Sequence, residues 1–145
     1  MTVQRVVVPD LIELRHRVLL PGESRAEAHF AGDDDPGTIH FGAFDLDRLV
    51  GCVTIMQRPH AGTPAWQLRG MAVEADCQRR GVGSTLIAAV DQVVTSHAIR
   101  RMWCNARSPA IAFYERHGWV VNGEEFVIPP AGPHRVMVCR KHERA

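Results

Sequence analysis

Hydrophobic positions recur every three or four residues in two long stretches of the chain, and this spacing predicts helices that bury one face. The first stretch follows Pro9 and ends before Pro21, and the second runs from Gly81 to His97. Ser108 followed by Pro109 is a typical helix start, with a hydroxyl at the N-cap and proline in the first turn, and Gly118 is a typical helix end. Together they predict a shorter helix over residues 109–117. Residues 23–30 are a further candidate for a short helix.

Between these stretches the apolar residues are consecutive or alternate, which predicts β-strands. The predicted strands cover residues 6–8, 39–44, 49–56, 66–73, 101–105, 119–128 and 135–139, where 119–121 leads towards 126–128. Gly70 lies inside one of them and marks a bulge or a close backbone approach. The order of helices and strands predicts an α/β (α+β) fold, in which helices pack on a mixed sheet.

Length and charge narrow the class of protein. A chain of 145 residues has the usual size of one domain, so we expect a single domain over residues 1–145. The apolar runs are far shorter than the ~18 residues that cross a bilayer, and the start resembles no signal or transit peptide, so we expect a soluble cytoplasmic protein with no membrane partner. A net charge of +1 gives no basis for nucleic-acid binding.

The cysteines and histidines have no spacing that predicts a metal site. The four cysteines contain no C-x-x-C pair, and the eight histidines contain no H-E-x-x-H pair. We therefore expect no metal, and we expect Cys52, Cys77, Cys104 and Cys139 to be free thiols.

Residues 78–83, with the sequence QRRGVG, lie between a predicted strand and a predicted helix. Gly81 and Gly83 let the backbone curl so that successive N–H groups point into one concavity at the positive end of the helix dipole. This arrangement predicts an anion cradle, and the alternative is a tight turn without a ligand. A Rossmann fingerprint would need glycine where Leu86 stands, and a Walker loop would need Gly-Lys-Ser/Thr.

Residues 66–119 resemble the GNAT superfamily of acyl-CoA-dependent N-acetyltransferases. QRRGVG matches its central signature, Q/R-x-x-G-x-G/A. A strand ending near Asn105, a helix carrying A-x-x-F-Y at residues 110–114 and the pair Gly118-Trp119 resemble its second signature. The resemblance implies a mostly antiparallel sheet of six or seven strands with a splayed central wedge and about four helices. It also implies an acetyltransferase that uses acetyl-CoA, and a homodimer is a common assembly among relatives.

The resemblance further implies where acetyl-CoA binds. The implied contacts are Met71, Ala72, Val73, Gln78, Arg79, Arg80, Gly81, Val82, Gly83, Ser84 and Asn105. Backbone amides of residues 79–84 would bind the pyrophosphate, whereas the arginine side chains are equally well explained as solvated charges. The strand at residues 71–73 would pair with the pantetheine arm, and the amide of Met71 or Ala72 would polarise the thioester carbonyl.

Tyr114 is the implied general acid that protonates the departing thiolate, and its alternative is a core aromatic residue. The general base is less determined. Glu74 and His134 are the catalytic candidates, and His40 is a further one. The alternative for Glu74 is a solvated charge at the end of a strand, and the alternative for the histidines is an ordinary surface position. Cys104 adjoins Asn105 and could lie near the thioester.

The acceptor is expected to be a primary amine of a small molecule or peptide. Its specificity is assigned to the loops at residues 20–37, 57–65 and 122–134. Arg69 is expected to meet a carboxylate of the protein or of the substrate, and the run Asp33 to Asp35 is expected to be a solvated loop. Two other functions stay open: a non-catalytic acyl-CoA-binding module and a nucleotide-phosphate-binding protein.

Overall fold

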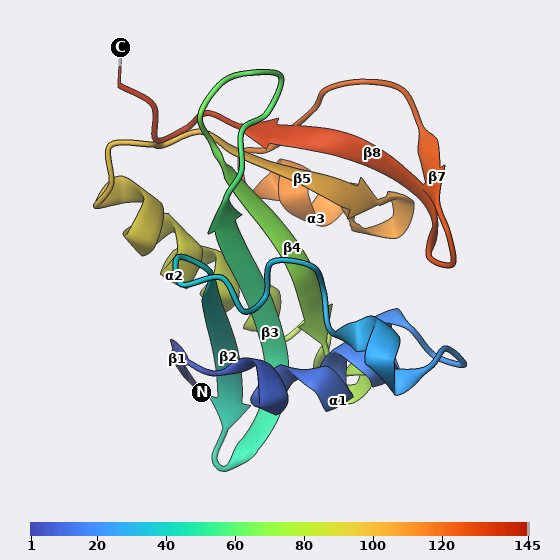
Figure 1. The fold of residues 1–145 in the computed structure, drawn as a ribbon. Helices are drawn as coiled ribbons and strands as arrows, with labels where there is room; N and C mark the ends of the chain where they lie inside the picture. Colours follow the sequence, from blue (N-terminus) through green and yellow to red (C-terminus); the bar gives the residue numbers. More distant parts are fainter. Residues whose placement is uncertain (145) are drawn as a thin grey trace.

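The computed structural model describes residues 1–144, and their course is shown in Figure 1. The elements in chain order are β1 (Thr2–Arg5), α1 (Val8–Leu19), η1 (Arg25–Ala28), β2 (Ile39–Asp45), β3 (Arg48–Gln57), β4 (Trp66–Val73), η2 (Ala75–Cys77), α2 (Val82–Thr95), β5 (Met102–Arg107), η3 (Ser108–Ala110), α3 (Ile111–Arg116), β6 (Val120–Val121), β7 (Phe126–Ile128) and β8 (Gly132–Cys139). Here η denotes a 3-10 helix.

All strands join one sheet in the order β1-β2-β3-β4-β5-β8-β6, and β7 also pairs with β8. Every pairing is antiparallel except that of β4 with β5. The mixed, mostly antiparallel sheet is therefore confirmed. It has eight strands rather than six or seven, because β6 and β7 are separate short strands, and the described chain has three α-helices and three 3-10 helices rather than about four helices.

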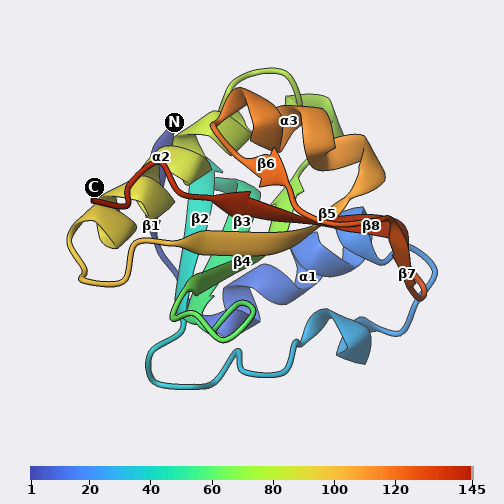
Figure 2. The same cartoon turned by 90° about the horizontal axis from the view of Figure 1, so that it is seen from above.

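Helices cover both faces of the sheet, with α2 and α3 on one face and α1 on the other (Figure 2). The apolar side of α2, including Leu86 and Val90, packs in the main core with Val53 and Leu68 of the sheet. Leu11 and Leu14 of α1 pack on the opposite face with Cys52 and Ala72. Side chains alternate across a strand, so β3 and β4 serve both layers.

β4 and β5 separate after a short stretch of pairing. Their parallel ladder joins Trp66 to Met102 and ends at Leu68 and Cys104, after which the two strands run apart (Figure 1). The register between β3 and β4 shifts near Gly70, which has a φ of +65°, so β4 carries an extra residue there. The splayed wedge and the bulge at Gly70 are thus confirmed.

The first strand was predicted at the wrong residues. Residues 6–8 do not form a strand: β1 is Thr2–Arg5, and α1 already begins at Val8. β1 is an edge strand whose residues are largely exposed, so it carries little hydrophobic signal. No helix within residues 1–144 is long and apolar enough to span a membrane.

Candidate active site

A cleft of about 500 Å³ opens where β4 and β5 diverge. Its floor comes from residues 67–71 of β4 and 104–107 of β5. Its walls come from residues 19–20, 27, 29–31 and 128–131, with Tyr114 and His134. The loops at residues 20–37 and 122–134 therefore contribute to the cleft as expected. The loop at residues 57–65 does not: Thr63 and Pro64 line a separate cleft at the opposite end of β4.

Tyr114 of α3 lies in this cleft with its ring held by two neighbouring aromatic rings. Phe113 and Trp119 have ring centroids 5.2 and 5.3 Å from that of Tyr114. No hydrogen bond within residues 1–144 engages its hydroxyl. Burial, and secondarily the nearby Cys104, raises the pKa of Tyr114 well above 10, so the phenol stays protonated. The hydroxyl is therefore available as a proton donor.

His134 lines the same cleft at the start of β8, and its ring is fixed in orientation. Its Nδ1 lies 2.7 Å from the carbonyl oxygen of Gly132 and its ring stacks on Phe126. Since a carbonyl oxygen can only accept, Nδ1 donates, and the neutral ring carries its lone pair on Nε2. No group within residues 1–144 bonds to Nε2, so this nitrogen is free to accept a proton.

Beyond Leu68, the edge of β4 that faces the wedge is not paired with β5, so its backbone groups are open to a ligand. Glu74 N–H donates to the carbonyl of Val50 in β3, so by strand alternation the amide of Ala72 also points toward β3. The amides of Met71 and Val73 point the other way, into the wedge. Met71 and Asn105 both line the cleft, and Asn105 pairs through its backbone with Val136 of β8.

Residues 79–84 form a loop of free amides at the start of α2. Gly81 is the N-cap residue in the left-handed conformation, with a φ of +82°, and no side chain caps the helix. Thr85 N–H is the first to bond within the helix, to the Gly81 carbonyl, which leaves the preceding amides without an acceptor in the described chain. Arg79 also has a positive φ of 65°. Such a concave run of amides fits a pyrophosphate.

The side chains around this loop have structural contacts. Gln78 Nε2 donates to the Val73 carbonyl, and the Ser84 hydroxyl lies 3.0 Å from His117 Nε2. A Cβ at Gly83 would come within 2.9 Å of the Phe113 ring, whereas a Cβ at Gly81 would have open space on the protein side. Gly83 is thus needed for the packing of α2 on α3, and Gly81 for the backbone conformation of the cradle.

Glu74 does not join the cleft. Its carboxylate receives two hydrogen bonds from Arg17 and one from Arg48, at 2.9–3.1 Å. The hydrogen bond from Arg17, opposed by desolvation and reinforced by both positive charges, lowers the pKa of Glu74. A carboxylate held in this way is a weak base that lies outside the cleft-lining residues. These contacts argue against the predicted role of Glu74 as general base.

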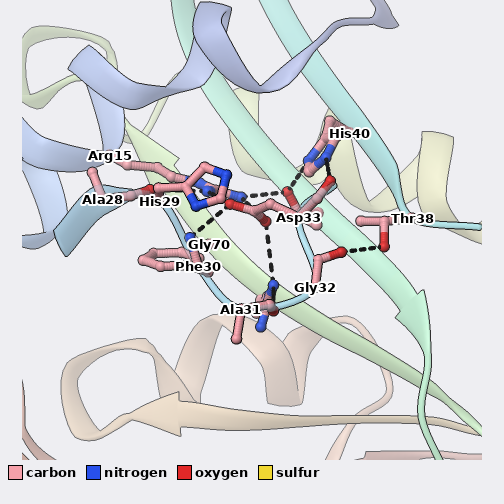
Figure 3. Close-up of polar contacts among 12 residues, drawn as sticks. Arg15, Ala28, His29, Phe30, Ala31, Gly32, Asp33, Thr38, His40 and Gly70 are labelled. Atoms are coloured by element: carbon pink, nitrogen blue, oxygen red, sulfur yellow. Dashed lines mark hydrogen bonds and ion pairs between the residues drawn. The ribbon is translucent and has the colours of Figure 1, made fainter. Parts of the chain in front are cut away.

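His40 is also removed from the cleft. It belongs to a buried polar cluster in which Arg15 donates to both Asp33 carboxylate oxygens at 2.6 and 3.2 Å and to the Thr54 hydroxyl (Figure 3). The two ring nitrogens of His40 bond to Thr54 and to the Asp33 carbonyl. Neither nitrogen is free for a substrate, so His40 has a structural role.

The same cluster corrects the prediction for the acidic run. Asp34 and Asp35 are exposed, but Asp33 is buried and ion-paired with Arg15. Arg69 lies 3.2 Å from the Asp33 carboxylate and also donates to the Ala31 carbonyl, which confirms that Arg69 meets a carboxylate and shows that it is one of the protein. Asp33 thereby fixes one wall of the cleft onto β4.

The four cysteines are free and buried. Cys104 lies in the cleft floor, where burial raises the pKa of its thiol far above the ordinary range. A thiol that stays protonated is a poor nucleophile. Cys104 therefore does not have the environment of a covalent catalyst.

Arg107, the last residue of β5, is a cleft residue that was not predicted from the sequence. Its guanidinium is half buried in the cleft, and its Nη2 donates to the Leu19 carbonyl at 2.7 Å. Desolvation lowers the pKa of Arg107. The alternation of β5 could have indicated it, because Ala106 packs in the core and its neighbours must face the other side.

Comparison with known proteins gives a consistent family and fold. The acetyltransferase (GNAT) family matches residues 8–119. The chain is 32% identical over 138 residues to the uncharacterized N-acetyltransferase YitI of Bacillus subtilis, covering 93% of each chain. Among solved structures, Escherichia coli ElaA has a TM-score of 0.78 at 16% identity, over 96% of this chain and 99% of that one. An aminoglycoside 6′-N-acetyltransferase in complex with coenzyme A has a TM-score of 0.71 at 16% identity, over 95% and 96%.

Proposed function

The chain belongs to the acetyltransferase (GNAT) family, and from this premise we propose that it transfers an acetyl group from acetyl-CoA directly to a primary amine. The observation that carries the proposal is that His134, with a free imidazole nitrogen, and Tyr114, with a free hydroxyl, both line the cleft where β4 and β5 part. A base and an acid in one cleft are what amine acetylation requires.

The residues present fit acetyl-CoA. The free amides of residues 79–84 suit its pyrophosphate, and the unpaired edge of β4 suits the amides of its pantetheine arm. When bound, acetyl-CoA supplies a thioester whose carbonyl carbon is the electrophile. The Met71 amide points into the wedge and would stabilise negative charge on the carbonyl oxygen.

His134 and Tyr114 divide the proton transfers. The acceptor attacks as the free amine: His134 Nε2 takes a proton from its nitrogen as the N–C bond forms, and the Tyr114 hydroxyl gives a proton to sulfur as the C–S bond breaks. Exchange with solvent then removes the proton from His134 and returns one to the Tyr114 phenolate. The products are an N-acetyl amine and the free thiol of CoA. The protonated state of Cys104 favours this direct transfer over an acetyl-cysteine intermediate. Four free cysteines suit a reducing compartment, and we place the reaction in the cytoplasm.

The test is release of CoA thiol from acetyl-CoA with a panel of amines, read together with mass spectrometry of the acetylated product. Calorimetry on the same protein measures acetyl-CoA binding separately. Tight binding of acetyl-CoA without acetylation of any amine would instead support the alternative of a non-catalytic acyl-CoA-binding module. Loss of CoA binding in the presence of ATP or NAD would support the nucleotide-binding alternative.

A further inference from the structure

Three arginines are at least half buried beside or beneath the cleft, and they differ in their partners. Arg15 and Arg69 both reach the carboxylate of Asp33. Arg107 has a single hydrogen bond, to the Leu19 carbonyl, and no ion pair with any carboxylate in residues 1–144. A half-buried cation without a counterion is costly, and a guanidinium has five N–H donors of which Arg107 uses one.

The cleft as a whole favours negative charge. Its lining contains two arginines and two histidines but one acidic residue, Glu27, which is exposed at the rim. Of the other basic residues in the lining, Arg69 shares the Asp33 carboxylate with Arg15, and His29 lies 2.9 Å from Asp34. Arg107 is therefore the cation that a ligand in this cleft would meet unpaired.

Arg107 also lies beside the proposed base. In the β5–β8 ladder Arg107 is directly opposite His134, and the two side chains stand on the same face of the sheet. Both residues line the cleft. A group bound to Arg107 would thus be adjacent to the nitrogen that receives a proton from the acceptor amine.

We propose that Arg107 binds a carboxylate of the acceptor, and that the acceptor is consequently a small primary amine that carries a carboxylate, such as an amino acid. This inference rests on the proposed acetyl transfer for its amine, but its carboxylate site stands on Arg107 alone. The planar guanidinium can form two parallel hydrogen bonds to a carboxylate, which lysine cannot. Gln67, on the cleft floor, adds a buried oxygen without a partner among residues 1–144, which suits an ammonium group.

The test compares amines that differ in a single charge. L-leucine is paired with L-leucinamide, and 4-aminobutyrate with 4-aminobutanamide, and putrescine serves as a dication. Each is titrated by calorimetry into the CoA-loaded protein and assayed for turnover with acetyl-CoA. The wild type should prefer a carboxylate over its amide by about tenfold to hundredfold, the range of a charge-assisted hydrogen-bond pair. The carboxamides carry the less basic and hence more available amines, so intrinsic reactivity favours the opposite order.

Three variants assign the preference to the residue. Arg107→Gln should abolish the preference, so that a carboxylate and its carboxamide bind about equally well. Arg107→Lys, which keeps the charge and a donor for Leu19, should keep part of the preference. Arg5→Gln, at an exposed position on the distant strand β1, should leave it unchanged. Thermal unfolding and CoA affinity of each variant show that it is folded.

The proposal is overturned if the carboxamides or putrescine bind as well as the carboxylates, if Arg107→Gln keeps the preference, or if no carboxylate in the set binds the CoA-loaded protein. Arg107-dependent binding of carboxylates without acetylation of any amine would refute the proposed acetyl transfer and leave the carboxylate site in place. The two ideas therefore fail in different measurements.

Discussion

His134 of β8 and Arg107 of β5 are paired across the antiparallel ladder, and both project into the cleft between β4 and β5. Phe126 of β7 extends this row on the other side of His134, and its ring stacks on the imidazole. The imidazole is thus held by the sheet on two sides and by the Gly132 carbonyl. These contacts fix the orientation of the imidazole ring and leave Nε2 without a hydrogen bond among residues 1–144.

Replacing His134 by asparagine should slow catalysis at neutral pH. Asparagine keeps a donor for the Gly132 carbonyl but offers no basic nitrogen, so kcat should fall by about 10²–10⁴-fold, the usual contribution of a general base. The rate should recover in part as the pH rises, because more of the amine is then already unprotonated. Single-turnover acetyl transfer measured across pH checks this.

His40→Asn is the matched control, since His40 is equally buried but bonds only to Thr54 and Asp33 within the described chain. It should lower the midpoint of thermal unfolding while leaving the transfer rate within a few fold. Equal rate losses in both variants would mean that His134 supports the fold and is not the base.

Removal of the Tyr114 hydroxyl should slow the chemical step and spare cofactor binding. Tyr114→Phe keeps the ring contacts with Phe113 and Trp119 and deletes the proton donor. We expect a loss in kcat of about 10²–10⁴-fold with an unchanged Kd for acetyl-CoA. Since the pKa of Tyr114 is raised well above 10, the wild type should show no loss of activity below pH ~10 from ionisation of this residue. An unchanged single-turnover rate would show that Tyr114 is a structural residue of the core and not the general acid.

The local structure of the proposed cofactor side could largely be predicted from sequence, because its determinants lie close together along the chain. Gly81 is a backbone requirement of one loop, and its positive φ explains why a glycine stands there. Gly70 could be predicted as a bulge or a close backbone approach because a glycine inside a strand often marks one of the two. Helices α2 and α3 followed from periodicity and from stop signals within a few residues of their ends.

The acceptor side depends on contacts between distant segments, which local pattern does not contain. Asp33 cannot be told from Asp34 in sequence, because its burial is set by Arg15, 18 residues earlier, and by Arg69, 36 residues later. Arg107 reaches Leu19 across 88 residues. Glu74 looked available in sequence because Arg17 and Arg48, its partners, come from two other elements.

Changing Gly81 to alanine should weaken acetyl-CoA binding. A Cβ at a φ of +82° costs about 1–2 kcal/mol if the loop keeps its conformation, and any relaxation would turn the free amides away from the pyrophosphate. We expect the Kd for CoA, measured by calorimetry, to rise by about tenfold or more, since 1.4 kcal/mol corresponds to a factor of ten.

Gly62→Ala is the control for backbone strain. Gly62 has a similar φ of +79° and open space for a Cβ, but it lies in the 57–65 loop away from the cradle. It should lose comparable stability with no change in CoA affinity. If Gly81→Ala bound CoA as tightly as the wild type, the pyrophosphate would have to be held elsewhere.

Neutralising Asp33 should destabilise the fold strongly at neutral pH. Asp33→Asn leaves Arg15 fully buried without its carboxylate, and breaking a buried pair in this way costs about 3–5 kcal/mol. Asp35→Asn, at an exposed position of the same acidic run, should change the free energy of unfolding by less than about 0.5 kcal/mol. Urea unfolding at pH 7 measures both.

The effect of Asp33→Asn should also depend on pH in a defined direction. Burial alone would raise the pKa of Asp33, but hydrogen bonds from Arg15 and the Phe30 amide and the charges of Arg15 and Arg69 outweigh it and lower the pKa below 3.8. A carboxyl whose pKa is lower in the folded than in the unfolded state stabilises the fold above the unfolded value, and this contribution is lost as pH falls through the folded value. The difference in unfolding free energy between wild type and Asp33→Asn should therefore be constant from pH 7 to about 5 and should shrink below about pH 4. A difference that stays constant down to pH 2 would show that the Asp33 carboxyl has no coupling to the two arginines.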